Sequence, residues 1–411
     1  MDLFRLSCAL LFIFGVLSDS SFGEDWLQWR GPNGNGTAES TVAPPAIWDT
    51  KEGIKWKAAI PGRGHASPIV SRDLVVIATA TDDAQFAIAY DRGDGSVRWK
   101  QRVHEGGVPT ELHRKNTAAS ATPTSDGEHF FFLFHNAGRL VLSALDRSGD
   151  IVWRKDTGGF QCDYRFGYGP SPVLYKGSLI VVSEHGDGYI AAFDKTDGVE
   201  QWRVPRKNKT SYSSPALANV SGKVQLLLSG ADKIVSYNPE NGEILWETAG
   251  SSLATCGTMI WSEELVFASG GFPNKETLAV KADGSGEVLW KNGEKSYEQS
   301  MLYHDGFVYT LNDNGIALCW NAETGDEKWK VRLGGPVSAS PILADGIVYA
   351  TNERGITFAF KANPEVFEKV GQFRLGDEGF ATPVFVGEEV FVRTADQGVE
   401  RQEYLYCIGQ R

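Results

Sequence analysis

Residues 171–204 read SPVLYKGSLIVVSEHGDGYIAAFDKTDGVEQWRV, and this stretch decides the fold. It contains four short apolar runs, at 171–175, 178–183, 189–194 and 200–204, each separated from the next by a polar turn. Runs of this length, rich in Val, Ile and Tyr and bounded by Gly and Asp, are typical of β-strands joined as hairpins. The stretch therefore predicts a four-stranded antiparallel unit.

The same pattern recurs along the chain at a period of about 45 residues. A typical copy starts with Ser-Pro or Thr-Pro and has a Trp on its fourth strand, and all copies have a small residue on the third strand. The starts are Ser67, Thr122, Ser171, Ser214, Ser340 and Thr382, with weaker copies at Cys256 and Ser300. The small residues are Ala89, Ala144, Ala192, Ser236, Ala279, Cys319, Ala359 and Cys407. The tryptophans are Trp56, Trp99, Trp153, Trp202, Trp246, Trp290 and Trp329. Eight such copies predict an all-β fold, an eight-bladed propeller with one four-stranded antiparallel blade per repeat.

The two ends of the chain are expected to share the eighth blade. The run 403–408 is a third strand with no fourth strand after it, whereas GIKWKAAI at 53–60 carries a Trp as fourth strands do. Pairing the two would close the ring and remove an open edge. Residues 24–52 should then pack outside the ring, and Val370 stands where the seventh copy lacks its Trp.

The N-terminus indicates export. Residues 1–23 read as a secretory signal peptide, with Arg5 before an apolar run at 10–17 and small residues at the end. The expected organisation is therefore a signal peptide at 1–23, a lead-in at 24–52 and the propeller at 53–411. No later run is long enough for a transmembrane span, so we expect a periplasmic or extracellular monomer. The net charge of −12 disfavours nucleic acid as a partner.

Three segments show the repeat in its clearest form: ALDRSGDIVW at 144–153, AFDKTDGVEQW at 192–202 and WNAETGDEKW at 320–329. They resemble the pyrroloquinoline-quinone-like (PQQ-like) propeller repeat, and the resemblance covers 53–408. One branch of that family is the quinoprotein dehydrogenases, which hold the quinone and Ca²⁺ over the propeller axis. The other is the outer-membrane β-barrel assembly (BamB-like) branch, which carries no cofactor and binds other proteins.

The resemblance to the second branch is the closer one. In the dehydrogenases an adjacent Cys-Cys pair covers the quinone, and this sequence has no such pair. The resemblance therefore implies no cofactor, with PQQ and Ca²⁺ as the less favoured possibility. No metal-binding spacing such as HxH or HExxH occurs, so we also expect no metal site.

Propeller geometry predicts which face carries function. The loops from the fourth strand of one blade to the first of the next share a face with the loops between second and third strands, and five of the seven His lie there. Loops on a rigid scaffold are where binding residues concentrate. The candidates on this face are Arg63, His65, His104, His113, Arg114, His135, Tyr164, Arg165, Tyr168, Glu184, His185, Asp187, Asn312, Arg332, Arg354 and Arg374. They predict a scaffold for a protein, carbohydrate or small ligand.

Two enzymatic alternatives stay open. In the first, Arg165, Arg63, Arg332 and Arg374 could clamp the carboxylates of an acidic carbohydrate while Tyr168 or a His acts as the base. In the second, the chain is a quinone-dependent dehydrogenase, although no residue can be assigned as its catalytic Asp. A disulfide between Cys162 and Cys256 is a further possibility in an oxidising compartment.

Overall fold

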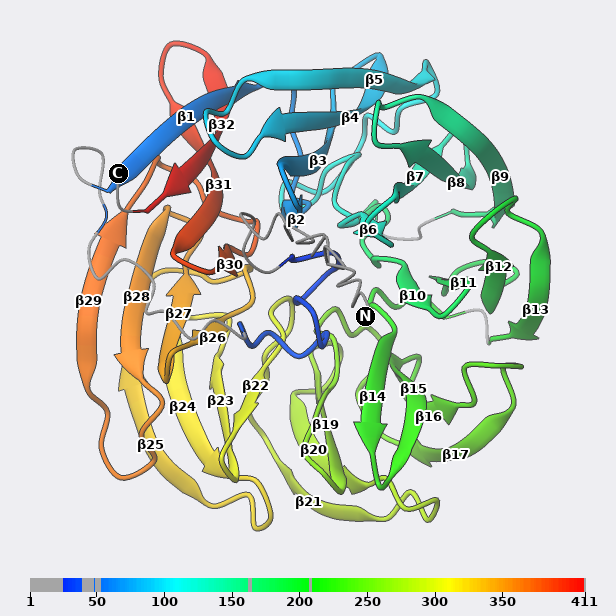
Figure 1. Cartoon of the computed structure of the whole chain (residues 1–411). Helices are drawn as coiled ribbons and strands as arrows, with labels where there is room; N and C mark the ends of the chain where they lie inside the picture. The colour runs from blue at the N-terminus through cyan, green and yellow to red at the C-terminus, as the bar shows by residue number, and fades with distance from the viewer. Residues whose placement is uncertain (1–24, 39–47, 49–52, 162–164, 207–208, 410–411) are drawn as a thin grey trace, which may run out of the picture.

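The structure, a computed structural model, describes residues 25–38, 48, 53–161, 165–206 and 209–409. In these residues eight four-stranded antiparallel sheets are arranged around a central axis (Figure 1). The predicted all-β, eight-bladed propeller is confirmed. The expected signal peptide at 1–23 lies outside the described residues.

The strands of each blade run from the axis outward and are called A to D. Blades one to four are β2 (Ile69–Ser71), β3 (Leu74–Ala80), β4 (Ala84–Asp91) and β5 (Val97–Glu105); β6 (Thr124–Ser125), β7 (His129–Asn136), β8 (Arg139–Asp146) and β9 (Ile151–Gly159); β10 (Val173–Tyr175), β11 (Ser178–Ser183), β12 (Tyr189–Asp194) and β13 (Glu200–Pro205); β14 (Ala216–Val220), β15 (Lys223–Gly230), β16 (Lys233–Tyr237) and β17 (Ile244–Ala249).

Blades five to eight follow the same order. They are β18 (Ile260–Trp261), β19 (Leu265–Gly270), β20 (Glu276–Lys281) and β21 (Val288–Asn292); β22 (Leu302–His304), β23 (Phe307–Leu311), β24 (Ile316–Asn321) and β25 (Glu327–Arg332); β26 (Ile342–Ala344), β27 (Ile347–Thr351), β28 (Ile356–Lys361) and β29 (Lys369–Arg374); β30 (Val384–Val386), β31 (Glu389–Gln397), β32 (Arg401–Ile408) and β1 (Ile54–Ile60).

The eighth blade joins the two ends of the chain, as the sequence predicted. Strand β1 pairs antiparallel with β32, with Trp56 opposite Cys407 and Ile60 opposite Glu403. The N-terminal strand is thus the D strand of the last blade. Because the closing strand comes from the other end of the chain, the ring cannot open at this seam without breaking the β1–β32 ladder.

The recurring Trp couples neighbouring blades. Trp99 lies opposite the small residue Ala89, and its indole N–H donates to the carbonyl of Arg147 in the next blade at 2.9 Å. Gly149 in that turn has φ +89°, and a Cβ there would lie 2.7 Å from Trp99 Cδ2. Glycine is therefore needed for both its conformation and its small size. Equivalent bonds from Trp to the next blade are made by Trp56, Trp153, Trp290 and Trp329.

Blade seven has Gly371, not Val370, at the Trp position. Gly371 lies opposite Ala359, just as Trp329 lies opposite Cys319 in blade six. The ring of Phe373, on the same D strand, lies over Gly371, where a Cβ would be 2.5 Å from that ring. Trp48, which is 1% exposed, stacks on Phe373 at 4.1 Å and on Tyr349 at 5.7 Å. A residue before the propeller thus adds the indole that this blade's D strand lacks.

Residues 25–38 of the lead-in do not pack outside the ring, where we expected them. Residues 25–38 lie at the centre of the propeller (Figure 1). Trp26 forms a bridge with Val70 of β2, and Thr37 forms one with Leu343 of β26. Arg30 donates to the carbonyl of Met301 at 2.6 Å. The A strands are only two to five residues long and leave a central channel, so the buried Trp26 gains more apolar contact there than on the outer rim.

Candidate functional site

A ring of buried hydroxyls surrounds the axis where the A strands begin. Its members are Ser67, Thr122, Ser171, Ser214, Thr258, Ser300, Ser340 and Thr382, which we call the hydroxyl ring. At six steps around it, the backbone N–H of one member donates to the hydroxyl oxygen of the next, at 2.9–3.1 Å. Thr258 differs, because its hydroxyl accepts from the indole of Trp29 at 2.9 Å. The recurring Ser-Pro and Thr-Pro starts therefore couple the blades at the axis.

Above this ring lies a cavity of about 180 Å³, the axial cavity. Every D-to-A loop in the propeller contributes at least one residue to its wall, and Trp29 of the lead-in contributes from the centre. The lining consists of Trp29, His65, His113, Lys115, Asn116, Ser120, Thr122, Phe166, Gly169, Ser171, Tyr212, Ser214, Cys256, Thr258, Tyr297, Glu298, Ser338, Phe380 and Thr382. The face that carries these loops and the B-to-C loops is called the loop face.

An ion pair reaches across the axial cavity. Lys115, in the loop before blade two, lies 3.1 Å from Glu298, in the loop before blade six, and these blades are opposite each other in the ring. It also lies 2.8 Å from Glu353. Burial by itself would lower the pKa of Lys115, but the two carboxylates outweigh it and raise that pKa. The ammonium therefore stays charged and ties the β5–β6 loop to the far wall.

His65 is held neutral at the edge of the cavity. Burial, reinforced by the positive charges of Arg63 and Arg393, lowers its pKa well below the ordinary value. Its ring stacks on Phe380 at 4.3 Å with an interplanar angle of 10°. A neutral imidazole can pack face to face on a phenyl ring without the cost of burying a charge.

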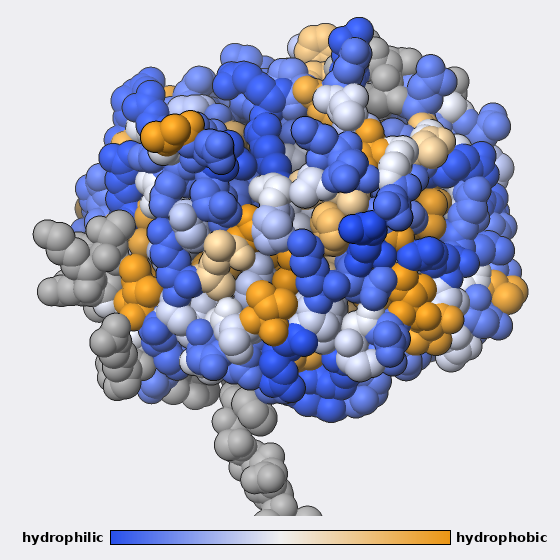
Figure 2. All heavy atoms as spheres, turned by 90° about the horizontal axis from the view of Figure 1, so that it is seen from above, coloured by the Kyte–Doolittle hydropathy of each residue, from blue (hydrophilic) through white to orange (hydrophobic). Residues whose placement is uncertain are grey.

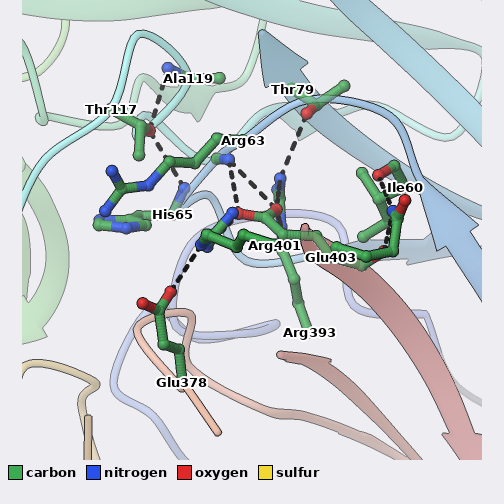
Figure 3. A network of polar contacts seen from close by, with 12 residues as sticks. Ile60, Arg63, His65, Thr79, Thr117, Ala119, Glu378, Arg393, Arg401 and Glu403 are labelled. Atoms are coloured by element: carbon green, nitrogen blue, oxygen red, sulfur yellow. Dashed lines mark hydrogen bonds and ion pairs between the residues drawn. The ribbon is translucent and has the colours of Figure 1, made fainter. Parts of the chain in front are cut away.

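Beside His65 lies a buried ion-pair network in the seam blade (Figure 3). Arg393 Nη2 lies 2.6 Å from a Glu403 oxygen, with both side chains 2% exposed. Glu403 also pairs with Arg401 at 2.7 Å, and Arg401 pairs with Glu378 at 2.8 Å. Glu403 in addition accepts the backbone N–H of Gly64 at 3.2 Å. The network fixes the loop that carries His65, and its Arg and Glu side chains pair with one another.

The structure separates the five candidate histidines. Only His65 and His113 line the axial cavity. His104 packs edge-on against Phe134 at 5.9 Å, and burial lowers the pKa of His104 to about 4. His135 and His185 both pack against Phe160, at 4.9 and 6.2 Å. In the described part of the chain, no group of three or more His, Cys, Asp and Glu could hold a metal ion.

Two other candidates belong to the packing around Phe160 and blade three. Tyr168 is buried, and its hydroxyl donates to the carbonyl of Val182 at 2.8 Å. Glu184 forms a buried pair with Arg206, whose Nε lies 2.6 Å from a Glu184 oxygen. Burial raises the pKa of Glu184 despite the neighbouring guanidinium. The side chains of Tyr168 and Glu184 therefore stabilise the packing of the blade.

The remaining candidates lie outside the axial cavity. Arg165 is 73% exposed and pairs with Glu111 at 2.9 Å, and Arg374 pairs with Asp377 at 2.9 Å. Arg63 donates to the carbonyl of Arg114 at 2.9 Å. Exposed positions are held by Arg114, Asp187, Arg332 and Arg354. The amide oxygen of Asn312 accepts two backbone N–H groups in its own turn, and Tyr164 lies outside the described residues. The described lining of the axial cavity therefore includes His65 and His113 but none of the four Arg of the carbohydrate-enzyme alternative.

Sequence reasoning missed most of the cavity wall. Trp29, Phe166 and Phe380 were not among the candidates because aromatic residues in loops are indistinguishable from packing residues until the ring closes. The recurring Ser-Pro and Thr-Pro starts were a usable signal, since a polar residue at the same place in every blade must face the axis. They were interpreted only as strand starts.

The cysteines in the described residues are free thiols. Cys319 and Cys407 are buried at the small-residue position, and burial raises the pKa of Cys319 to about 12. Cys256 is a free cysteine that lines the cavity, and burial raises its pKa well above the ordinary value. Its suggested disulfide partner, Cys162, lies outside the described residues.

The repeat, the closed ring and the loop face now allow comparison with known proteins. A family model described as "Outer membrane protein assembly factor BamB" matches residues 45–142, 88–271 and 274–363. The chain belongs to this family. BamB of Yersinia pestis is 22% identical over 313 residues, covering 71% of each chain. BamB of Bordetella pertussis is 24% identical over 297 residues, covering 67% of each. The match to BamB of Moranella endobia, at 24% identity, covers 44% of this chain and 48% of that one, about half its length.

Solved structures of a dehydrogenase and of a BamB protein share the fold of this chain. A europium-containing methanol dehydrogenase superposes with a TM-score of 0.72 at 11% identity, covering 94% of this chain and 98% of that one. BamB from Moraxella catarrhalis superposes with a TM-score of 0.59 at 13% identity, covering 85% and 98%. At such identities the similarity establishes the propeller and nothing of the chemistry. Within the described residues, no helix is long and apolar enough to span a membrane.

Proposed function

We propose that this BamB-family chain is an exported scaffold that binds a protein partner through its loop face and supports the assembly of outer-membrane proteins. Family membership supports the scaffold role, and the convergence of all eight D-to-A loops on one face supports its location. The observation that carries the proposal is an exposed aromatic side chain on that face.

Phe272 is this side chain. It lies in the B-to-C loop of blade five and is 51% exposed. Its carbonyl accepts the backbone N–H of Ala254 at 2.9 Å. The preceding Gly271 packs so closely on the cavity residue Tyr297 that a Cβ there would lie 1.7 Å from the ring. Phe272 is thus held in place beside the axial cavity, as an aromatic anchor for a partner should be.

Among the described residues, the outer rim has no exposed aromatic side chain comparable to Phe272. The side of the molecule seen in Figure 2 is largely hydrophilic, with apolar side chains in small groups. The exposed large apolar residues of the D strands are all aliphatic, and they occur singly, as at Val97 and Val152, or as adjacent pairs, as at Ile244–Leu245 and Val288–Leu289. Small groups of exposed aliphatic residues are normal on a soluble protein. The loop face is therefore the better docking surface.

The proposal includes the absence of a quinone and of dehydrogenase activity. PQQ is a polycarboxylate, and it would need several free cations around it. Among the described lining residues the single Lys, Lys115, is already neutralised by Glu298 and Glu353, and His65 is held neutral. The residues present do not fit the quinone. The signal peptide predicted at 1–23 supports a periplasmic or extracellular location.

The proposal is tested by complementation in a bacterium that lacks its own BamB. Wild-type protein should restore the amount of folded outer-membrane β-barrel protein, measured by heat-modifiable mobility on gels. Phe272→Ala should restore less than half of it, because truncating an aromatic anchor costs about 2 kcal/mol of binding or more.

Val152→Ala is the matched control, because Val152 is also 51% exposed but lies on the rim. It should restore the wild-type level. The proposal fails if wild-type protein restores nothing, or if Phe272→Ala and Val152→Ala behave alike.

A further inference from the structure

The floor of the axial cavity has a surplus of hydrogen-bond donors. Five members of the hydroxyl ring line it: Thr122, Ser171, Ser214, Thr258 and Thr382. All five are buried, with exposures between 2% and 7%. A hydroxyl carries one proton to donate and two lone pairs to accept with. The hydroxyl oxygen of each of the five already accepts a hydrogen bond from an N–H group.

The protons of these hydroxyls have no acceptor among the described residues. The hydroxyls of Ser120 and Ser338, which also line the cavity, do have one: Ser120 donates to Asn116 and Ser338 donates to Glu353 at 2.7 Å. A buried donor without a partner is costly and calls for a ligand or ordered water. Five such donors around one small space make a floor suited to a molecule with several acceptor oxygens.

The walls add aromatic surface and no net positive charge. Phe380 carries the stacked ring of His65, and Phe166 packs edge-on to Tyr212 at 5.8 Å. The Lys115 ammonium is matched by Glu298 and Glu353. Among the described lining residues, an anion would meet the Glu298 carboxylate and no free Lys or Arg to balance its charge, so a neutral ligand is favoured.

The geometry points to a binding site for a neutral sugar ring in the axial cavity. The ring oxygen and the hydroxyl oxygens of the sugar accept hydrogen bonds from the five floor hydroxyls. The sugar's own hydroxyls donate to Glu298, and the C–H face of the sugar packs on the aromatic walls. The site is distinct from the proposed docking of a protein at Phe272, so either proposal can fail without the other. The cavity of about 180 Å³ has the volume of about six waters, which the sugar displaces.

The test uses glucose, galactose, mannose and N-acetylglucosamine as probes, with glucuronate and inorganic phosphate as anionic counterparts. Isothermal titration calorimetry on the exported chain should show at least one neutral sugar binding with a Kd of about 1 mM or tighter. Glucuronate and phosphate should bind at least tenfold more weakly. The sugar should also change the tryptophan fluorescence, and Trp29→Phe should remove that change.

Variants of the floor decide whether the hydroxyls hold the sugar. Ser214→Ala should weaken sugar binding about two- to tenfold, the usual effect of losing one hydrogen bond. If the Ser214→Ala variant does not fold, Thr382→Val is used as the test variant in its place. Ser340→Ala is the matched control, since Ser340 belongs to the hydroxyl ring but does not line the cavity. The inference is overturned if no neutral sugar binds, if the anions bind as well, or if Ser214→Ala and Ser340→Ala have the same affinity.

Discussion

Replacing Trp48 by Ala should destabilise the propeller as much as removing one of its own repeat tryptophans. Trp48 is 1% exposed and stacks on Phe373 at 4.1 Å. A buried aromatic of this size removes roughly 200 Å² from water. At about 25 cal/mol per Å² this corresponds to about 5 kcal/mol, from which the area kept by Ala must be subtracted. We therefore expect a loss of about 4 kcal/mol in the free energy of unfolding.

The assay is urea unfolding followed by circular dichroism, comparing Trp48→Ala with Trp329→Ala. Trp329 occupies the repeat position in blade six and donates to the carbonyl of Asn363 at 2.8 Å. Both variants should lose stability to a similar extent. Val370→Ala is the control, because Val370 is 43% exposed beside Gly371, and it should change stability by less than about 0.5 kcal/mol.

A double-mutant cycle locates the effect in blade seven. Combining Trp48→Ala with Phe373→Leu should give a coupling of about 0.5–1.5 kcal/mol, as expected for a stacked aromatic pair. Two results would refute the reasoning: a loss below about 1 kcal/mol for Trp48→Ala, or strict additivity of the two substitutions. Either would mean that Trp48 does not replace the missing repeat Trp.

Two further predictions concern the turns and the pH dependence. In urea titrations, Gly149→Ala should lower the free energy of unfolding by about 1–3 kcal/mol more than Gly306→Ala. Both glycines have positive φ, but a Cβ at Gly149 would meet Trp99, whereas a Cβ at Gly306 would meet nothing within 4 Å. Equal losses would show that the Trp contact is unimportant. His104→Gln should flatten the fall in stability on acidification, because burial lowers the pKa of His104 from 6.5 to about 4. The unfolded chain takes up the proton first, so stability is lost as the pH falls from 6.5 towards 4, by at most about 1.4 kcal/mol per pH unit for this group. Urea midpoints measured at three pH values would contradict this if they changed with pH equally in the variant and the wild type.

Much of the fold was predictable because propeller contacts repeat. The repeat Trp lies opposite the small residue of its own blade and, in five copies, against the turn glycine of the next blade, so the repeated pattern predicted the blade and its neighbours. Strand β1 could be assigned to the seam because Trp56 carries the mark of a D strand. The assignment of Val370 was wrong by one residue, because Gly371 lies opposite Ala359, in the register that places Trp329 opposite Cys319 in blade six.

The site was less predictable because its residues converge from separate loops. His65, His104 and His135 look alike in the sequence, yet only His65 faces the axis, since the other two belong to strands whose side chains point into blade packing. The placement of the lead-in was missed for a related reason. Residues 25–38 carry no repeat, and nothing local shows that their buried Trp26 and Arg30 lie in the central channel.

The sequence by itself determined the class of fold, the number of blades, the closure of the ring and the family resemblance. These follow from a local pattern that recurs at a fixed period, and each copy carries its own information. Only the tertiary structure decided where the lead-in lies, that Trp48 completes blade seven, and which loop residues form the axial cavity. These depend on contacts between residues hundreds of positions apart, such as Lys115 with Glu298 and Trp29 with Thr258, which exist only once the ring has closed.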